Sequence, residues 1–188
     1  MDISRSPDSS DGTTPTGGWL TLAKNGPVIY ARPVKAILYF FFQAPEADSS
    51  VSSIGISGKS QGSEDGRLLN TEQMSMEISN SNAAQETVYA VCANGSAKTR
   101  TFMQTAAAGS IWKGKIEMNS SSVSFYAGVK GGALSAATTI STNLPAGTNG
   151  LTPYIGGWTY KKRCNGAGVN TNHVTAIGDW QLDWWVAK

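Results

Sequence analysis

The chain has 188 residues, which suits one domain large enough to bury a sizeable core. Charged residues make up only 15% of it, against about 25% in an ordinary globular protein, and the formal net charge is +2. So small a charge excludes the basic surface that a nucleic-acid partner requires, and no apolar run reaches the roughly 18 residues that membrane insertion as a helix requires.

Residues 1–18 are polar and rich in Ser, Asp, Gly, Pro and Thr, so they cannot bury enough apolar area to fold alone. We therefore predict a flexible N-terminal arm or linker over 1–18, which either frays or orders on a partner, and one folded domain over 19–188. The arm has no apolar h-region, so we expect no signal peptide. Cys92 and Cys164 are too few for a disulfide framework; free thiols in a cytosolic protein are the simpler interpretation, and their pairing is left open.

The chain after Trp19 is predicted to consist of short strands. The predicted strands cover residues 35–44, 50–58, 73–79, 88–93, 98–105, 111–118, 122–129 and 176–187. The first of these is apolar on both faces, as in a strand covered on both sides. Several others alternate apolar and polar residues, which is typical of half-buried strands, and Asn94-Gly95 is a hairpin signal between two of them.

Two of the alternating strands carry large side chains that we assign to the core. These side chains are Trp112, Ile116 and Met118 in one strand and Trp180, Leu182 and Trp184 in the other. No segment shows a helical period of 3.6 residues sustained over three turns. Many short strands with turn signals between them predict an all-β sandwich or barrel.

Several short motifs follow one another in the C-terminal half of the chain. They are WKGKIEMN (112–119), VSFY (123–126), TTISTNLP (138–145), LTPYI (151–155) and DWQLDWW (179–185). Their order and spacing resemble concanavalin-A-like jelly-roll domains of bacteriophage virion structural proteins, in head decoration, head-fibre or tail proteins. The resemblance covers roughly residues 85–188 and, more weakly, the segment 35–58.

The resemblance implies a two-sheet antiparallel jelly-roll sandwich and a place in the phage particle. The stretch FYAGVKGGALSAATTISTNLP (125–145) would then be a strand, a long flexible turn and a second strand that ends at a proline. Its small residues would let one sheet curve over the other. A fold by itself never establishes a function, so the virion role is an expectation by analogy.

The residues argue against a nucleotide, metal or nucleophilic site, so we predict no cofactor, no metal and no catalytic residue. Gly58-Lys59-Ser60 resembles the end of a phosphate-binding loop, but Ser53 stands where the motif needs its first glycine. The single histidine, His173, lies in a polar segment expected to be a solvated loop. One histidine and two distant cysteines cannot furnish a closed zinc site, and no calcium-loop motif is present.

A glycosidase pair of carboxylates is also not predicted. Enzymes with this sandwich resemble each other in a Glu-x-Asp-x-x-Glu strand, which the chain lacks; Glu46 and Asp48 come nearest but read as a loop. Asp179 and Asp183 share a strand face, yet four residues of strand separate them by about 13 Å. Glycosidase pairs lie about 5 to 9.5 Å apart, so the spacing argues against catalysis.

One segment remains as a candidate contact. In GGWTYKKRCNG (156–166), Trp158 and Tyr160 share a strand face beside Lys161, Lys162 and Arg163. Exposed aromatics with nearby donors can stack on sugar rings or on bases. A further alternative is a contact between the basic tip and a neighbouring capsid or fibre subunit. The simpler alternative is a core-facing Trp and Tyr followed by a charged hairpin tip.

Together these observations predict a non-enzymatic phage virion protein, with the virion as its location. The preferred role is a capsid decoration or head-fibre protein that binds the particle surface, with other virion proteins as partners and a homo-oligomer as the expected state. The alternative is a carbohydrate-recognising receptor-binding module of a tail or fibre, with a host-surface glycan as its ligand.

Overall fold

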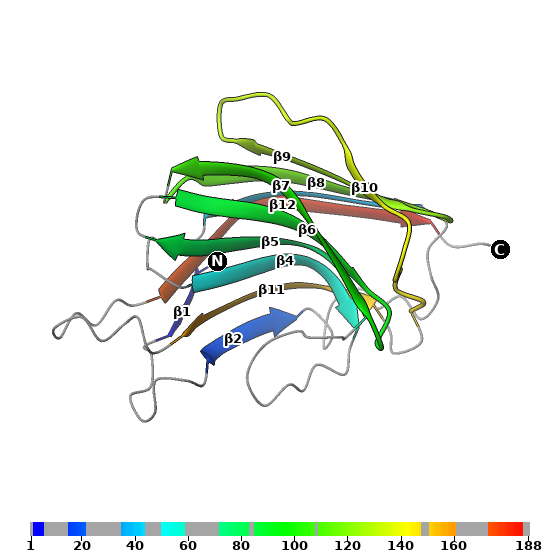
Figure 1. Cartoon of the computed structure of the whole chain (residues 1–188), viewed down its shortest axis with the longest axis horizontal. Helices are drawn as coiled ribbons and strands as arrows, with labels where there is room; N and C mark the ends of the chain where they lie inside the picture. The colour runs from blue at the N-terminus through cyan, green and yellow to red at the C-terminus, as the bar shows by residue number, and fades with distance from the viewer. Residues whose placement is uncertain are drawn as a thin grey trace, which may run out of the picture.

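The structure is a computed structural model. It describes the backbone of residues 2–5, 15–21, 35–43, 50–58, 72–82, 85–107, 109–147, 151–160 and 173–185. Within these residues the chain forms twelve strands in two six-stranded antiparallel sheets (Figure 1). In this part of the chain, no helix is long and apolar enough to cross a membrane. The two packed sheets confirm the predicted all-β sandwich.

The two sheets are named sheet I and sheet II. From edge to edge, sheet I comprises β1 (Asp2–Arg5), β12 (His173–Trp185), β3 (Lys35–Gln43), β8 (Ile111–Asn119), β9 (Val123–Val129) and β10 (Thr138–Ile140). Sheet II comprises β2 (Pro15–Thr21), β11 (Leu151–Tyr160), β4 (Ser50–Gly58), β5 (Gln73–Asn82), β6 (Gln85–Ala93) and β7 (Lys98–Ala107). Strands adjacent in space are often distant in sequence, as the crossovers of a jelly roll require.

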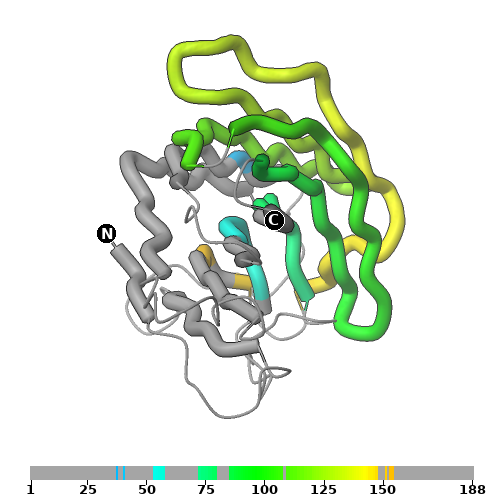
Figure 2. Tube along the Cα trace, turned by 60° about the vertical axis from the view of Figure 1, so that its left-hand side comes forward, coloured from blue at the N-terminus to red at the C-terminus, as the bar shows by residue number. Residues whose placement is uncertain are grey.

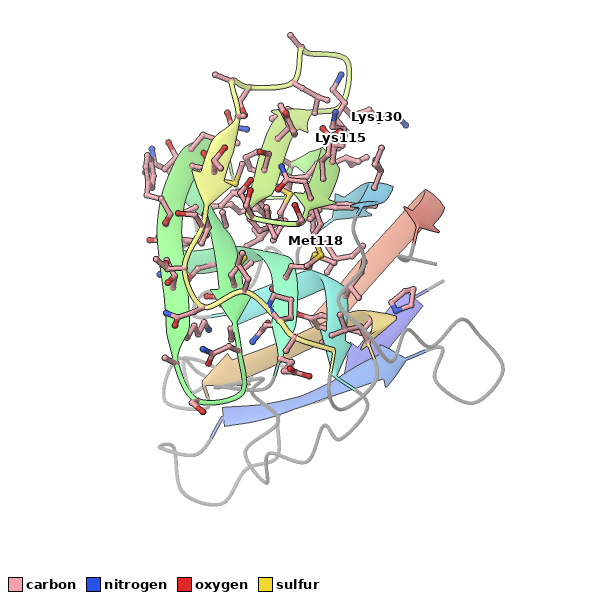
Figure 3. All side chains as sticks on the ribbon, turned by 90° about the vertical axis from the view of Figure 1, so that its right-hand side faces the viewer. Lys115, Met118 and Lys130 are labelled. Carbon is pink, nitrogen blue, oxygen red and sulfur yellow. The ribbon has the colours of Figure 1, made fainter. Side chains whose placement is uncertain are left out.

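The core lies between the sheets and follows the predicted alternation. In β8, Trp112, Ile116 and Met118 are buried, whereas Lys115 and Glu117 are only partly covered. Figure 3 shows Met118 between the two layers and Lys115 on the outer side of sheet I. Period-two alternation therefore identified the buried face of this strand correctly.

Gly114 leaves room in the core for the ring of Phe40. The two residues lie opposite each other in the pairing of β3 with β8. A Cβ built on Gly114 would lie 2.2 Å from Phe40 Cζ and 2.4 Å from Cε2, so the ring covers the glycine. Such cross-strand pairing of an aromatic ring with a glycine fills the gap that a missing side chain leaves in a sheet.

The segment between β9 and β10 folds back on β9 and projects beyond the sheets (Figures 1 and 2). Ser135 N donates to Ala127 O at 2.8 Å, and Ala127 N donates to Ser135 Oγ at 3.2 Å. A Cβ on Gly128 would lie 2.3 Å from Ala133 O, so only glycine fits this close approach. β10 is shorter than the predicted strand: it ends at Ile140, and Asn143, three residues later, adopts a left-handed φ of 51°.

The N-terminal segment differs from the predicted arm. β1 pairs with β12, and β2 pairs with β11, so parts of residues 1–18 belong to the two sheets and the predicted boundary falls inside β2. The physical reason is that a sheet edge accepts a strand through backbone hydrogen bonds, which need no apolar side chains. Composition alone therefore underestimated how far the sheets extend.

The register of β12 agrees with the face assigned to its aromatic residues. Trp180 lies opposite Phe40, which is buried in the core, and Leu182 and Trp184 follow on alternate positions. The register shifts between Ile177 and Trp180, so the regular alternation holds from Trp180 onward. The pairing sets position 180 opposite a core position of β3, and the burial of Trp180, Leu182 and Trp184 stays a prediction.

Candidate functional site

Sheet II has a polar face opposite the core. In β4 and β5 the buried apolar residues alternate with serines, Gln73 and Glu77, which therefore point away from the core. The polar face continues across the sheet, because residues of β6 and β11 lie opposite these polar residues in the strand pairing, and residues of β7 lie opposite those of β6. The polar face, as used below, consists of Ser53, Ser57, Gln73, Ser75, Glu77, Tyr89, Lys98, Arg100, Phe102 and Tyr154.

The inner part of the polar face is a buried hydrogen-bond network. Tyr154 Oη lies 2.5 Å from Ser53 Oγ and donates to Gln73 Oε1 at 3.1 Å, while Ser75 Oγ donates to the same Gln73 oxygen at 3.0 Å. All four residues are buried. Burial raises the pKa of Tyr154 well above its usual range, and the hydrogen bond from Ser53 opposes that rise only in part.

The raised pKa of Tyr154 predicts a loss of stability in alkali. Above about pH 10 an unfolded tyrosine loses its proton while the buried one keeps it, so the unfolded state binds fewer protons and the free energy of unfolding falls. Tyr154→Phe removes the ionisable hydroxyl and therefore this contribution to the loss of stability. We expect urea melts to show a steeper decline for the wild type, by up to about 1.4 kcal/mol per pH unit above about pH 10. Parallel declines in both proteins would rule out Tyr154 as the source.

The outer part of the polar face is centred on Glu77. Arg100 Nε donates to Glu77 Oε1 at 2.8 Å, and Lys98 Nζ donates to Oε2 at 3.2 Å. The Glu77 side chain is 10% exposed, whereas those of Arg100 and Lys98 are 35% and 27% exposed. A nearly buried carboxylate thus holds two basic groups that reach solvent.

Two aromatic rings extend this arrangement. The guanidinium carbon of Arg100 lies 3.2 Å from the centre of the Tyr89 ring. The Tyr89 and Phe102 rings meet edge to face, with centres 6.2 Å apart, and Phe102 is 57% exposed. We call Glu77, Tyr89, Lys98, Arg100 and Phe102 the aromatic–basic cluster.

Local strand geometry places the cluster. Tyr89 lies between Glu77 of β5 and Phe102 of β7 in one row of the sheet, so three strands bring their side chains together. The register of β6 with β7 shifts between Val88 and Tyr89, and Met103 packs against the core. Lys98, Arg100 and Phe102 share the polar face because they alternate in the regular stretch of β7 before this shift, and the extra residue, Met103, follows them.

The contact residues predicted from the sequence lie elsewhere in sheet II. Trp158 and Tyr160 belong to β11, which β4 and β5 separate from β6. Trp158 is four residues beyond Tyr154 in a regular register, so its position falls on the polar face rather than the core face. Lys161, Lys162 and Arg163 lie outside the described residues, and the contact role of this segment stays a prediction.

The aromatic–basic cluster was not predicted, although part of its signal is in the sequence. Lys98, Arg100 and Phe102 alternate in the predicted strand 98–105, which marks a basic and aromatic strand face. Glu77 precedes Arg100 by 23 residues, and no local pattern links the two.

Where the structure describes them, the residues considered for a catalytic, phosphate or metal site lie in β4, β6 and β12. His173 begins β12 in sheet I, opposite Arg5, rather than in the predicted loop. Asp183 lies opposite Ile37, whereas Asp179 falls where the register of β12 is irregular. Five of the candidates lie outside the described residues: Glu46, Asp48, Lys59, Ser60 and Cys164. Gly58 ends β4 opposite Leu151, and Cys92 is buried in the core. Among the described residues, no group of three or more His, Cys, Asp or Glu side chains is arranged to hold a metal ion.

Comparison with protein-family models and with curated proteins gives no match. Solved structures do match. An alginate lyase from Pseudomonas aeruginosa aligns with a TM-score of 0.53 and 12% identity over 89% of this chain and 82% of that one. A functionally unknown protein from Saccharomyces cerevisiae aligns with a TM-score of 0.51 and 10% identity over 99% and 89%.

An alginate lyase from Klebsiella pneumoniae aligns with a TM-score of 0.52 and 8% identity over 81% of this chain, which spans only 60% of that enzyme's length. At such low identity these likenesses establish the fold alone. The chain has the concanavalin-A-like jelly-roll fold that its motifs predicted.

Proposed function

We propose that this protein is a non-enzymatic carbohydrate-binding protein and that the aromatic–basic cluster contacts the sugar. The observation that carries the proposal is the exposed ring of Phe102, held at the edge of an ordered cluster of donors. This is the receptor-binding alternative from the sequence, assigned to a different part of sheet II.

The chemistry of the cluster suits a sugar. Arg100 covers one face of Tyr89, so Phe102 supplies the ring surface that remains exposed. Aromatic rings stack on the apolar faces of sugars, and the neighbouring basic groups donate hydrogen bonds to sugar oxygens. By analogy, solved structures with this fold include enzymes named for a polysaccharide, alginate, which supports the choice of ligand class.

Two observations support binding without catalysis. The one histidine of the chain lies in sheet I, so it does not belong to the sheet that carries the polar face. Tyr154, a hydroxyl-bearing residue of that face, is only 4% exposed, and burial raises its pKa. A neutral, covered phenol is poorly suited to act as a general base near neutral pH. The capsid-decoration role and the virion location stay predictions that rest on sequence resemblance.

The proposal predicts that Phe102→Ala weakens saccharide binding about tenfold, because stacking of an aromatic ring contributes about 1–1.5 kcal/mol. The matched control is Leu134→Ala, which removes a side chain 39% exposed in the segment between β9 and β10. A glycan array identifies the ligand, and titration calorimetry compares the variants. Equal binding by wild type and Phe102→Ala would contradict the assigned site.

Catalysis is tested separately. When the protein is incubated with alginate, we expect no rise in the ultraviolet absorbance that the unsaturated product of a lyase would cause. A sustained rise that scales with protein concentration would show that the protein is an enzyme.

A further inference from the structure

The terminal nitrogens of Arg100 are open donors on the polar face. Nε donates to Glu77 Oε1 at 2.8 Å, and the guanidinium carbon lies 3.2 Å from the centre of the Tyr89 ring. In the described part of the chain, the two terminal nitrogens make no hydrogen bond to a protein atom. Their N–H groups lie in the guanidinium plane and are open to a ligand, in the same cluster as the exposed ring of Phe102.

A guanidinium held in this way is arranged in advance for a planar or tetrahedral oxyanion. The arginine fork matches the two oxygens of a carboxylate or sulfate, and such charge-assisted pairs are stronger than neutral hydrogen bonds. Because Glu77 anchors one end and Tyr89 supports the plane, Arg100 loses little further freedom when a ligand binds.

The charge of the cluster favours the same ligand. Lys98 and Arg100 bring two positive charges to the single negative charge of Glu77, which leaves one positive charge in excess. Both basic side chains reach solvent, whereas the carboxylate is 90% covered. A ligand approaching from solvent therefore meets the cations first.

We propose that Arg100 binds an oxyanion group of an acidic saccharide, a carboxylate or a sulfate, and that Glu77 is the residue that positions it. This inference rests on the proposed carbohydrate-binding function and names the class of ligand.

The experiment uses the full chain and three polysaccharides: polygalacturonate for carboxylates, dextran sulfate for sulfates and dextran as the neutral probe. Affinity electrophoresis at two salt concentrations measures binding by the wild type, Arg100→Lys and Arg100→Gln. The matched control is Lys113→Gln, which removes one positive charge from β8 in the other sheet. Melting temperatures establish that each variant is folded.

We expect the wild type to bind at least one polyanion better than dextran, and whichever it prefers identifies the oxyanion. Arg100→Lys should weaken that binding roughly tenfold to a hundredfold although it keeps the charge, because lysine lacks the fork. Lys113→Gln should change it less than about twofold.

Glu77→Gln separates positioning from simple charge attraction. Removing a negative charge should strengthen polyanion binding if only net charge matters. If Glu77 positions Arg100, the affinity should instead fall severalfold, because the anchor of Nε weakens. The melting curve shows whether the variant remains folded, and the direction of the affinity change is a readout that a purely structural role would not predict.

Three results would overturn the inference. Equal binding of dextran and the polyanions, with no effect of Arg100→Lys, would leave carbohydrate binding intact but remove the oxyanion contact. Equal losses in Arg100→Gln and Lys113→Gln would indicate diffuse electrostatic attraction. No binding of any polysaccharide, here or on the glycan array, would remove the proposed function as well.

Discussion

Replacing Trp112 with alanine is expected to lower the free energy of unfolding by about 3–5 kcal/mol, the usual cost of truncating a buried tryptophan. Trp112 is fully buried between the sheets, and its Nε1 donates to Glu86 Oε2 at 2.6 Å. Glu86 is also fully buried and accepts a second bond, from Gly109 N at 2.7 Å. The variant therefore opens a cavity and removes a donor from a buried carboxylate. Urea denaturation followed by circular dichroism measures the loss.

The two parts of this effect can be separated. Trp112→Phe keeps most of the ring but removes the N–H, so it should cost about 1.5–3 kcal/mol when Glu86 is present. In a Glu86→Gln background the acceptor is neutral, and the same change should cost less. An equal cost in both backgrounds would show that the indole contributes by packing alone.

Gly114→Ala is expected to destabilise the protein by about 1–3 kcal/mol through overpacking. The new Cβ would lie 2.2 Å from the Phe40 ring, which is itself buried in the core. Phe40→Leu should therefore offset part of the loss, so that the double variant is more stable than the sum of the two single changes predicts. Thermal and urea melts of the four proteins complete the cycle.

The control for this cycle is Gly132→Ala, at an exposed position where the nearest atom, Val129 O, would lie 3.3 Å from the new Cβ. That change should stay within about 0.5 kcal/mol. Either of two results would contradict this explanation: a harmless Gly114→Ala, or no compensation by Phe40→Leu. Both would show that the Phe40 ring is not the reason why β8 has a glycine at position 114.

Much of the fold was predictable because each buried strand face leaves a period-two pattern. Met74, Met76 and Ile78 alternate with polar residues, and the structure buries all three in the core. Asn94-Gly95 predicted a hairpin, and Asn94 Oδ1 accepts from Ser96 N and Ala97 N while Gly95 adopts a φ of 93°. These signals are local, so one sequence is enough to read them.

The rest depended on contacts that no local pattern records. β1 and β2 join the sheets through backbone pairing, which polar residues allow as readily as apolar ones. Glu77 and Arg100 belong to strands that a third strand separates, so only the register brings them together. Serines alternate with apolar residues in β4 and β5, which is the pattern of a half-buried strand, yet Ser53, Ser57 and Ser75 are all buried. Alternation predicts which face a residue occupies but not how much of that face is covered.

The most direct test of the account is a titration of the protein with oligogalacturonate, followed by backbone amide chemical shifts. If the aromatic–basic cluster binds the acidic sugar, the largest shift changes will fall on the amides of residues 98–102 in β7 and on Glu77 and Tyr89. Largest changes on the outer face of β8, in the segment between β9 and β10, or at no residue, would contradict the account.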